Sequence, residues 1–154
     1  MTDDAAPGSA VRAGERAKTI AAFEITLRIM RKAIDCFPDH DMESILVFMT
    51  VAAASTSRHL RDEAVLDLVD QEPLPDRLHR PTSGRAIAEA MGLPRETVRR
   101  RINSLVEAGL LTRDGGGVRT SSGLLNRGRL MEFARFMAQE LSAASSRLAR
   151  YDKP

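Results

Sequence analysis

The stretch that decides the fold is Thr82–Leu111, which reads TSGRAIAEAMGLPRETVRRRINSLVEAGLL. Its first part predicts a short helix over Ser83–Met91, with the serine as N-cap. Gly92 suits the tight turn that follows, because glycine accepts a positive φ. Its second part predicts a helix over Arg95–Ala108, which Gly109 ends. The apolar residues of this second helix recur at helical spacing and form one buried face: Val98, Ile102, Leu105 and Val106.

A hairpin is predicted directly after the second helix. The loop Asp114–Gly117 contains three glycines and separates two short strand candidates, Leu110–Arg113 and Val118–Ser121. Glycine-rich loops of this length between short apolar segments are typical of β-hairpins. Two helices joined by a tight turn form a helix-turn-helix, and the hairpin adds a wing to it. The predicted fold class is therefore mainly α with a small two- or three-stranded β-wing.

The positive charge of the chain is concentrated in the same region. The segment from Arg77 to Arg119 contains nine arginines and four acidic residues. Its net charge is +5, although the whole chain carries only +2. The remainder is therefore acidic overall, with a net charge of −3. A basic segment on an otherwise acidic chain indicates a surface that faces a polyanion. Every cation in it is arginine, whose planar fork suits bidentate contacts to phosphate or guanine.

Helices are also predicted on both sides of this module. Asp39–His59 is apolar nearly all round, which predicts a central buried helix capped by Asp39 or Asp41. The last helix is expected over Leu124–Tyr151. The first is expected over Glu15–Phe37, where two apolar faces predict packing on its own domain and on a partner chain. Its main stripe follows a 3-4-3-4-3 spacing: Ile20, Phe23, Leu27, Met30, Ile34 and Phe37.

Between the second helix and the module, Leu60–Asp70 either continues that helix or forms a separate short one. The stretch Gln71–Pro81 contains three prolines and is interpreted as a connector. The predicted organisation is a disordered tail at 1–14, N-terminal scaffold and dimerisation helices at 15–72, the winged helix-turn-helix at 80–122, and a C-terminal dimerisation helix at 124–151.

The module resembles the winged helix-turn-helix of bacterial transcription regulators. The run Ile87–Val98 is similar to their leucine-alanine, leucine-glycine, serine-arginine-x-threonine-valine pattern, and Leu105–Leu111 to their leucine-glutamate-x-glycine-leucine ending. GntR-type regulators share this motif but carry it at the N-terminus. Two helices before the module and one long helix after it are similar to the order in the multiple-antibiotic-resistance (MarR-type) regulators. Pro94 departs from the pattern, because it stands where a capping serine is common.

The resemblance implies a homodimer that reads palindromic double-stranded DNA. The second helix of the module would lie in the major groove, and the first and last helices would form the dimer interface. Arg101, at the edge of the buried stripe, is expected to pair locally. Phe23, Leu27, Phe48 and Met49 are interpreted first as core, and a pocket among them for a small apolar ligand is the alternative. The residues expected to contact DNA are Arg85, Arg95, Thr97, Arg99, Arg100, Asn103, Arg113 and Arg119.

Two other functional hypotheses stay open. A docking module would use the same winged fold to bind protein without touching DNA, but the net charge of +5 argues against it. Arginine-rich helix faces also occur on ordinary solvated surfaces, where Glu96 would pair with Arg100 at i,i+4. An enzyme is disfavoured, since the sequence shows no phosphate loop, dinucleotide fingerprint or nucleophile motif. We expect no catalytic residue, no cofactor and no metal. The N-terminus lacks the apolar core of a signal peptide, and no apolar run spans a membrane, so we expect a cytoplasmic protein.

Overall fold

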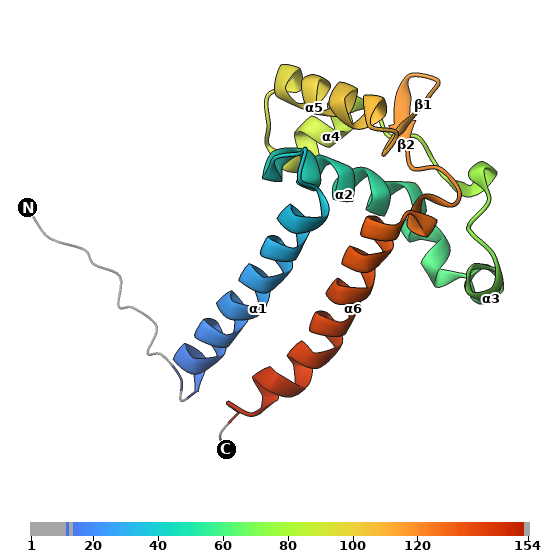
Figure 1. Cartoon of the computed structure of the whole chain (residues 1–154). Coiled ribbons are helices and arrows are strands. Elements are labelled where there is room, and N and C mark those ends of the chain that lie inside the picture. The colour runs from blue at the N-terminus through green and yellow to red at the C-terminus, as the bar shows by residue number, and fades with distance from the viewer. Residues whose placement is uncertain (1–11, 13, 153–154) are drawn as a thin grey trace, which may run out of the picture. The chain divides into compact units, whose positions relative to one another are not determined.

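The computed structural model describes Arg12 and residues 14–152, and these residues form two compact units. The tail expected at 1–14 lies outside the described residues except for Arg12 and Gly14. One unit comprises residues 33–134 and the other combines the described residues up to 32 with 135–152. The elements, in chain order, are α1 (Glu15–Cys36), α2 (Met42–Thr56), η1 (Ser57–Arg61), α3 (Glu63–Gln71), η2 (Asp76–Leu78), α4 (Gly84–Met91), α5 (Arg95–Glu107), β1 (Thr112–Asp114), β2 (Gly117–Arg119), η3 (Leu124–Asn126) and α6 (Gly128–Ala149) (Figure 1).

The core of the 33–134 unit is built around α2, which contacts α4, α5 and β2. The predicted central buried helix is thereby confirmed, but its bounds were too wide. It begins at Met42, where Asp41 caps it by accepting a hydrogen bond from the Ser44 N–H at 2.9 Å. After Thr56 the chain tightens into the 3-10 turn η1, so α3 is a separate helix. The buried apolar residues of α2 are Ile45, Val47, Phe48 and Val51.

Helices α4 and α5 form the predicted helix-turn-helix. The Ser83 hydroxyl caps α4 by accepting from the Ala86 N–H at 3.2 Å, and Gly92 ends it at φ +64°. Pro94 precedes α5 and provides no side-chain cap, as expected from its missing acceptor. Val98, Ile102 and Leu105 are buried as predicted, whereas Val106, the fourth member of the predicted face, is only half-buried. The turn and the stripe together fix which face of α5 is left for solvent.

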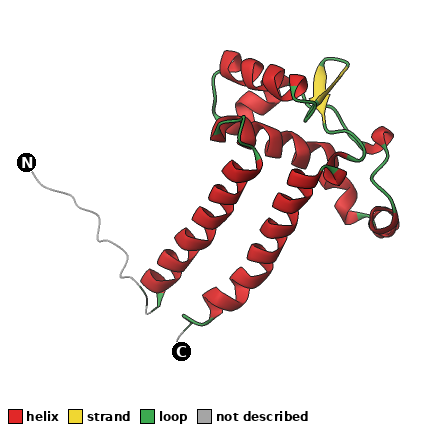
Figure 2. Cartoon of the chain, in the orientation of Figure 1, coloured by secondary structure: helices red, strands yellow, loops and turns green. Residues whose placement is uncertain are grey.

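The wing is a two-stranded antiparallel sheet (Figure 2), and Thr82 extends it by a single bridge to β2. Arg113 pairs with Val118 across the hairpin, and Thr82 bridges to Val118 from the other side through backbone hydrogen bonds of 2.8 and 3.0 Å. The strands are shorter than predicted. Leu110 and Leu111 do not pair, because their N–H groups bond back to the Leu105 carbonyl and complete the end of α5.

The connector at 71–81 is anchored to the wing. His79 is buried, with its Nδ1 2.9 Å from the Thr120 hydroxyl and its Nε2 3.0 Å from the Leu74 carbonyl oxygen. A carbonyl only accepts, so Nε2 carries a proton and donates. The Thr120 N–H in turn bonds the buried Ser55 hydroxyl at 3.4 Å. This network connects α2, the connector and the segment that follows β2.

The other unit pairs the first part of α1 with the second part of α6, which run side by side (Figure 1). The buried Glu140 carboxylate accepts from Arg28 at 2.8 Å and from Arg147 at 3.3 Å, and Lys18 pairs with Asp152. The last helix is shorter than predicted, since η3 precedes it and Arg127 is extended. No helix among the described residues is long and apolar enough to cross a membrane.

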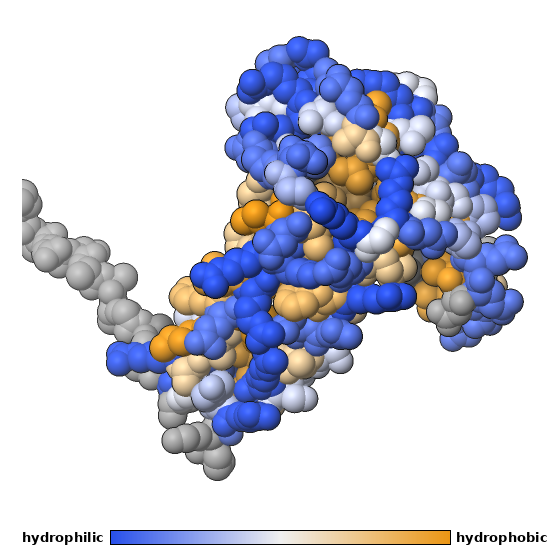
Figure 3. Space-filling view, viewed as in Figure 1, coloured by the Kyte–Doolittle hydropathy of each residue, from blue (hydrophilic) through white to orange (hydrophobic). Residues whose placement is uncertain are grey.

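The apolar stripe of α1 lies mostly on the surface. Ile25, which is off the stripe, is buried, whereas Phe23 is 69% exposed. Figure 3 shows apolar patches reaching the surface along α1, while the surface over α4 and α5 is mostly hydrophilic. Of the predicted stripe, Phe37 alone is buried, and the exposed members are Ile20, Phe23, Leu27, Met30 and Ile34.

Candidate nucleic-acid interface

The outward face of α5 presents three exposed arginines, Arg95, Arg99 and Arg100. They lie off the Val98–Leu105 stripe, whose burial against the rest of the unit turns them to solvent. Arg95 and Arg100 make no side-chain hydrogen bond or ion pair with any described residue. Thr97 is half-buried beside them. The face therefore has the charge and the exposure that contact with a polyanion requires.

Glu96 pairs with Arg99, at i,i+3, and not with Arg100 as the i,i+4 spacing had suggested. The contact is bidentate: Arg99 Nε lies 2.8 Å from one Glu96 oxygen and Nη2 lies 2.6 Å from the other. The hydrogen bonds from Arg99, helped by the charges of Arg99 and Arg100, hold the pKa of Glu96 below its ordinary value. Arg100 makes no hydrogen bond to Glu96 and acts on it only through its charge.

Arg101 is held away from the outward face by α2. Its Nη2 lies 2.6 Å from an Asp41 oxygen and 2.9 Å from a Glu43 oxygen. The hydrogen bond to Glu43 and the charges of both carboxylates raise the pKa of Arg101. The sequence indicated that Arg101 pairs rather than reaches outward, but its partners come from a helix more than fifty residues earlier. The pairing fixes α5 on α2 beside the N-cap.

One hydrogen bond connects α5 to the wing. Arg113, on the exposed strand β1, donates from Nη2 to the Asn103 side-chain oxygen. Both residues belonged to the predicted contact set, and the fold brings them together although ten residues separate them. At the far end of α5, Arg127 donates to the Gly109 carbonyl oxygen at 2.6 Å, a capping role that the sequence did not reveal.

Arg119 differs from the other predicted contact residues, because two carboxylates bind its guanidinium and little of its side chain reaches solvent. Its side chain is only 14% exposed; its Nε lies 2.8 Å from Asp114 and its Nη1 lies 3.2 Å from Asp76. The hydrogen bond to Asp114, together with Asp76, raises the pKa of Arg119. Asp76 also accepts from the Ser122 N–H at 2.6 Å, which lowers its own pKa. Arg119 therefore links the connector to the wing.

Arg85 lies in the first turn of α4, where it is exposed and paired with Glu89 at 2.8 Å. This is an i,i+4 pair on the surface, which contributes little to stability and opens at small cost. Arg85 therefore stays accessible, unlike Arg119. The eight predicted residues thus divide into two free arginines, three paired but exposed arginines, two half-buried polar residues and one half-buried arginine, Arg119, that pairs with two carboxylates.

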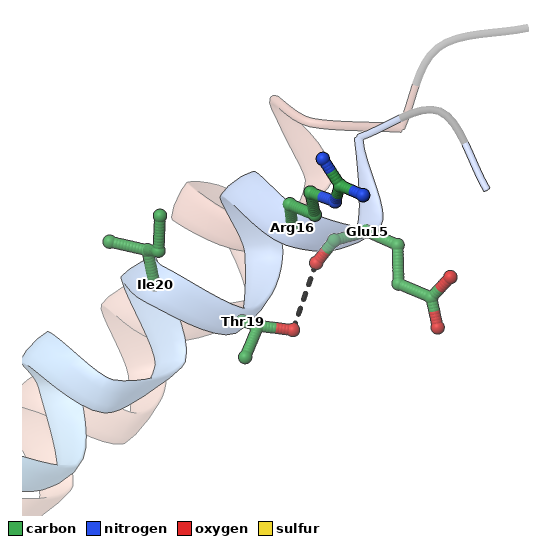
Figure 4. A pocket seen from close by; sticks show the side chains of 4 residues that line it. All are labelled: Glu15, Arg16, Thr19 and Ile20. Atoms are coloured by element: carbon green, nitrogen blue, oxygen red, sulfur yellow. Dashed lines mark hydrogen bonds between the residues drawn. The ribbon is translucent and has the colours of Figure 1, made fainter. Parts of the chain in front are cut away.

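Other candidate sites carry less chemistry. The described residues contain no group of three His, Cys, Asp or Glu side chains that could hold a metal. Phe48 is buried in the core, with its ring 5.6 Å from that of Phe37. A shallow open hollow at the start of α1 is lined by Glu15, Arg16, Thr19 and Ile20 (Figure 4). There the Thr19 hydroxyl donates to the Glu15 carbonyl oxygen at 2.9 Å, and the charged groups of Glu15 and Arg16 point apart.

The comparison with protein families gives a match to the helix-turn-helix region. Residues 64–115, about one third of the chain, match the IclR helix-turn-helix domain. No curated protein and no solved structure matches the chain. The matched range runs from α3 to the wing turn, yet the helix that packs behind α4 and α5 is α2, which precedes it. The match and the fold together support a winged helix-turn-helix of the kind that DNA-binding transcription regulators carry.

Proposed function

We propose that this chain is a transcription regulator that inserts α5 into the major groove of a palindromic operator as a homodimer. One observation carries the proposal: α5 buries one face completely and presents three exposed arginines on the other. A recognition helix needs this division, because the buried face fixes its orientation while the exposed face meets the DNA. The matched helix-turn-helix domain supports the same function.

The contact set follows from the pairing of each side chain. Arg95 and Arg100 are free to approach phosphates directly, and Arg85 reaches them once its surface pair with Glu89 opens. Arg113 and Asn103 form the edge of the surface between α5 and the wing. We leave Arg119 out of the proposed contacts, because contact with DNA would break two ion pairs that hold the connector.

The homodimer rests on the exposed stripe of α1. Five large apolar side chains at heptad-like spacing face solvent, and Leu141 on α6 is exposed as well. Apolar stripes of this kind bury themselves against another helix, and a second copy offers an identical stripe. A two-fold dimer would present two α5 helices to two half-sites, which is the MarR-like arrangement that the order of helices suggested.

A small apolar effector would bind at the surface that Phe23 and Leu27 form. Four residues were considered for this site in the sequence. Phe48 is one of them, but it is buried against Phe37 in the core and is therefore left out of the proposed site. Phe23 and Leu27 are exposed and belong to the other compact unit. A ligand there would compete with dimerisation, so its binding would lower the apparent affinity for DNA.

The test of DNA binding is a fluorescence-anisotropy titration of sheared double-stranded DNA at several salt concentrations. We expect binding to weaken steeply with salt, and the slope of log K against log salt to fall by about 0.9 for each phosphate contact removed. Arg95→Ala/Arg100→Ala should therefore flatten the slope. Arg58→Ala/Arg150→Ala removes the same charge from exposed positions outside the module and should leave the slope unchanged.

Absence of binding by the folded wild-type protein at low salt would contradict the proposal. It would favour the alternative, a winged-helix module that docks to protein. The pairing of Arg85, Arg99 and Arg119 with carboxylates is the observation that favours this alternative, because it reduces the free positive charge of the surface.

A further inference from the structure

The pair of Glu96 and Arg99 leaves one edge of the guanidinium free. Arg99 uses Nε and Nη2 on Glu96, so the side edge of the fork is occupied. The remaining N–H groups, on Nη1 and on the outer side of Nη2, form the end edge with two parallel donors. Two parallel donors match the O6 and N7 acceptors that guanine presents in the major groove. The pairing therefore orients the guanidinium without using up its recognition edge.

The pair is also close to electrically neutral, which separates it from its neighbours. The phosphate contribution to binding depends on net positive charge and on the counterions it releases. A carboxylate within 2.8 Å of the guanidinium largely cancels that attraction, whereas the directional hydrogen bonds to a base edge remain. Arg95 and Arg100, in contrast, carry their full charge on the same helix face with no carboxylate bonded to them.

The position suits a base reader. Glu96 lies in the first turn of α5 and Arg99 one turn later, both exposed. The N-terminal residues of a recognition helix are the ones that reach base edges. An oriented arginine also loses less side-chain entropy on binding than a free one, because Glu96 has already restricted its rotamers.

We propose that Glu96 is a positioning residue that presents the end edge of Arg99 to a guanine in the major groove, while Arg95 and Arg100 contact phosphates. This inference rests on the proposed DNA-binding function and names the residues that give it sequence specificity. It predicts that specificity and salt dependence, which usually change together when an arginine is removed, are carried by different arginines of one helix.

The experiment uses the full chain and a duplex pool with 20 randomised base pairs as the probe. Rounds of selection with the wild type define the preferred duplex, and anisotropy then measures its affinity relative to an unselected pool over a range of salt. Arg99→Lys keeps the charge and removes the fork. We expect it to reduce discrimination by roughly five-fold or more at one guanine position and to leave the salt slope unchanged. Arg100→Ala should reduce the slope by about 0.9 and leave the base preference intact.

Glu96→Ala gives the sharpest result, because affinity for the unselected pool and preference for the selected duplex should change in opposite directions. It removes a negative charge, so affinity for the unselected pool should rise and the salt slope should steepen. It also releases Arg99, so preference for the selected duplex should fall. Glu89→Ala is the matched control: it frees Arg85 on α4 in the same way and should raise affinity for both probes without changing base preference.

Three outcomes are distinguishable. Loss of discrimination in Glu96→Ala and Arg99→Lys, but not in Glu89→Ala, supports the proposal. Equal changes of both affinities in Glu96→Ala, or an unchanged base preference in Arg99→Lys, would overturn it while DNA binding itself stands. Failure of the folded wild type to bind any duplex at low salt would overturn the proposed function, and this inference with it.

Discussion

Helices α5 and α1 carry apolar stripes of similar period, but the fold treats them in opposite ways. In α5 the stripe is buried in the core, and Leu105 is 0% exposed. In α1 five members of the stripe face solvent, and a residue off the stripe, Ile25, is buried instead. The same pattern in the sequence therefore describes one apolar stripe that is buried within the chain and one that is not.

The difference shows what periodicity measures. Apolar residues at helical spacing report that one face prefers to be buried, but they do not say against what. For α5 the partners are α2 and α4. For α1 the described residues leave the stripe open, which is why we assign it to a second copy of the chain.

The largest expected effect is on the buried stripe. Leu105→Ala should lower the free energy of unfolding by roughly 2–5 kcal/mol, because it leaves a cavity in a packed core. Urea unfolding followed by circular dichroism measures the change. The milder Val98→Ala serves if the first variant does not fold. Phe23→Ala, on the exposed stripe, should change the unfolding of a dilute sample by well under ~1 kcal/mol. Equal effects at Leu105 and Phe23 would erase the contrast between the two helices.

The exposed stripe should matter for assembly instead. Leu27→Glu should raise the dimer dissociation constant by at least about tenfold, because a carboxylate in an apolar interface must be desolvated. Sedimentation velocity over a concentration series measures it. Thr26→Glu adds the same charge at an exposed neighbouring position and should leave the constant nearly unchanged. A wild type that stays monomeric at the highest concentrations would show that the stripe has another occupant.

Two adjacent glycines of the wing show the same contrast between a packed and an open position on a smaller scale. A Cβ on Gly117 would lie 2.8 Å from the Thr82 carbonyl oxygen, whereas one on Gly116 would meet nothing within 4 Å. Gly117→Ala should therefore force the bridge between Thr82 and Val118 apart and cost roughly 1–3 kcal/mol. Gly116→Ala should be close to neutral. Thermal unfolding of the two variants measures the difference. If Gly117→Ala is as stable as Gly116→Ala, the bridge to Thr82 does not hold the wing in place.

The smallest effect concerns the ion pair that attaches α5 to α2. Burial raises the pKa of Asp41, but the Ser44 N–H and hydroxyl and the charge of Arg101 lower it more, so the net pKa lies below the ordinary value. A carboxylate with a lowered pKa stabilises the fold above its unfolded pKa, about 3.9, and this contribution disappears as the pH falls through the folded pKa.

Asp41→Asn keeps a good N-cap and removes the charge, so it isolates this pair. It should lower the free energy of unfolding at pH 7 by less than ~1 kcal/mol, since the side chain is half exposed. The difference from the wild type should shrink as the pH falls below about 3.9 and disappear once the pH is below the lowered pKa of folded Asp41. A difference that persists at low pH would show that Asp41 acts through the cap and not through Arg101.

Much of the module was predictable because its signals are local. The N-cap at Ser83, the positive φ of Gly92 and the burial of Val98, Ile102 and Leu105 all follow from neighbours within one or two turns. The wing was predicted in kind but not in bounds, since Leu110 and Leu111 complete the helix end through the Leu105 carbonyl. Arg119 was assigned to the surface because its partner Asp76, forty-three residues earlier, leaves no local trace.

The sequence by itself determined the helix-turn-helix, the glycine turns, the wing and the basic face of α5. Periodicity, capping and φ preference act over a few residues, so their result is written in a short stretch of chain. Only the tertiary structure decided which arginines are free, since ion pairs such as Arg101 with Asp41 and Arg119 with Asp76 join residues far apart in the chain. It also decided which face of α1 stays open, because burial depends on the partners that the whole fold supplies.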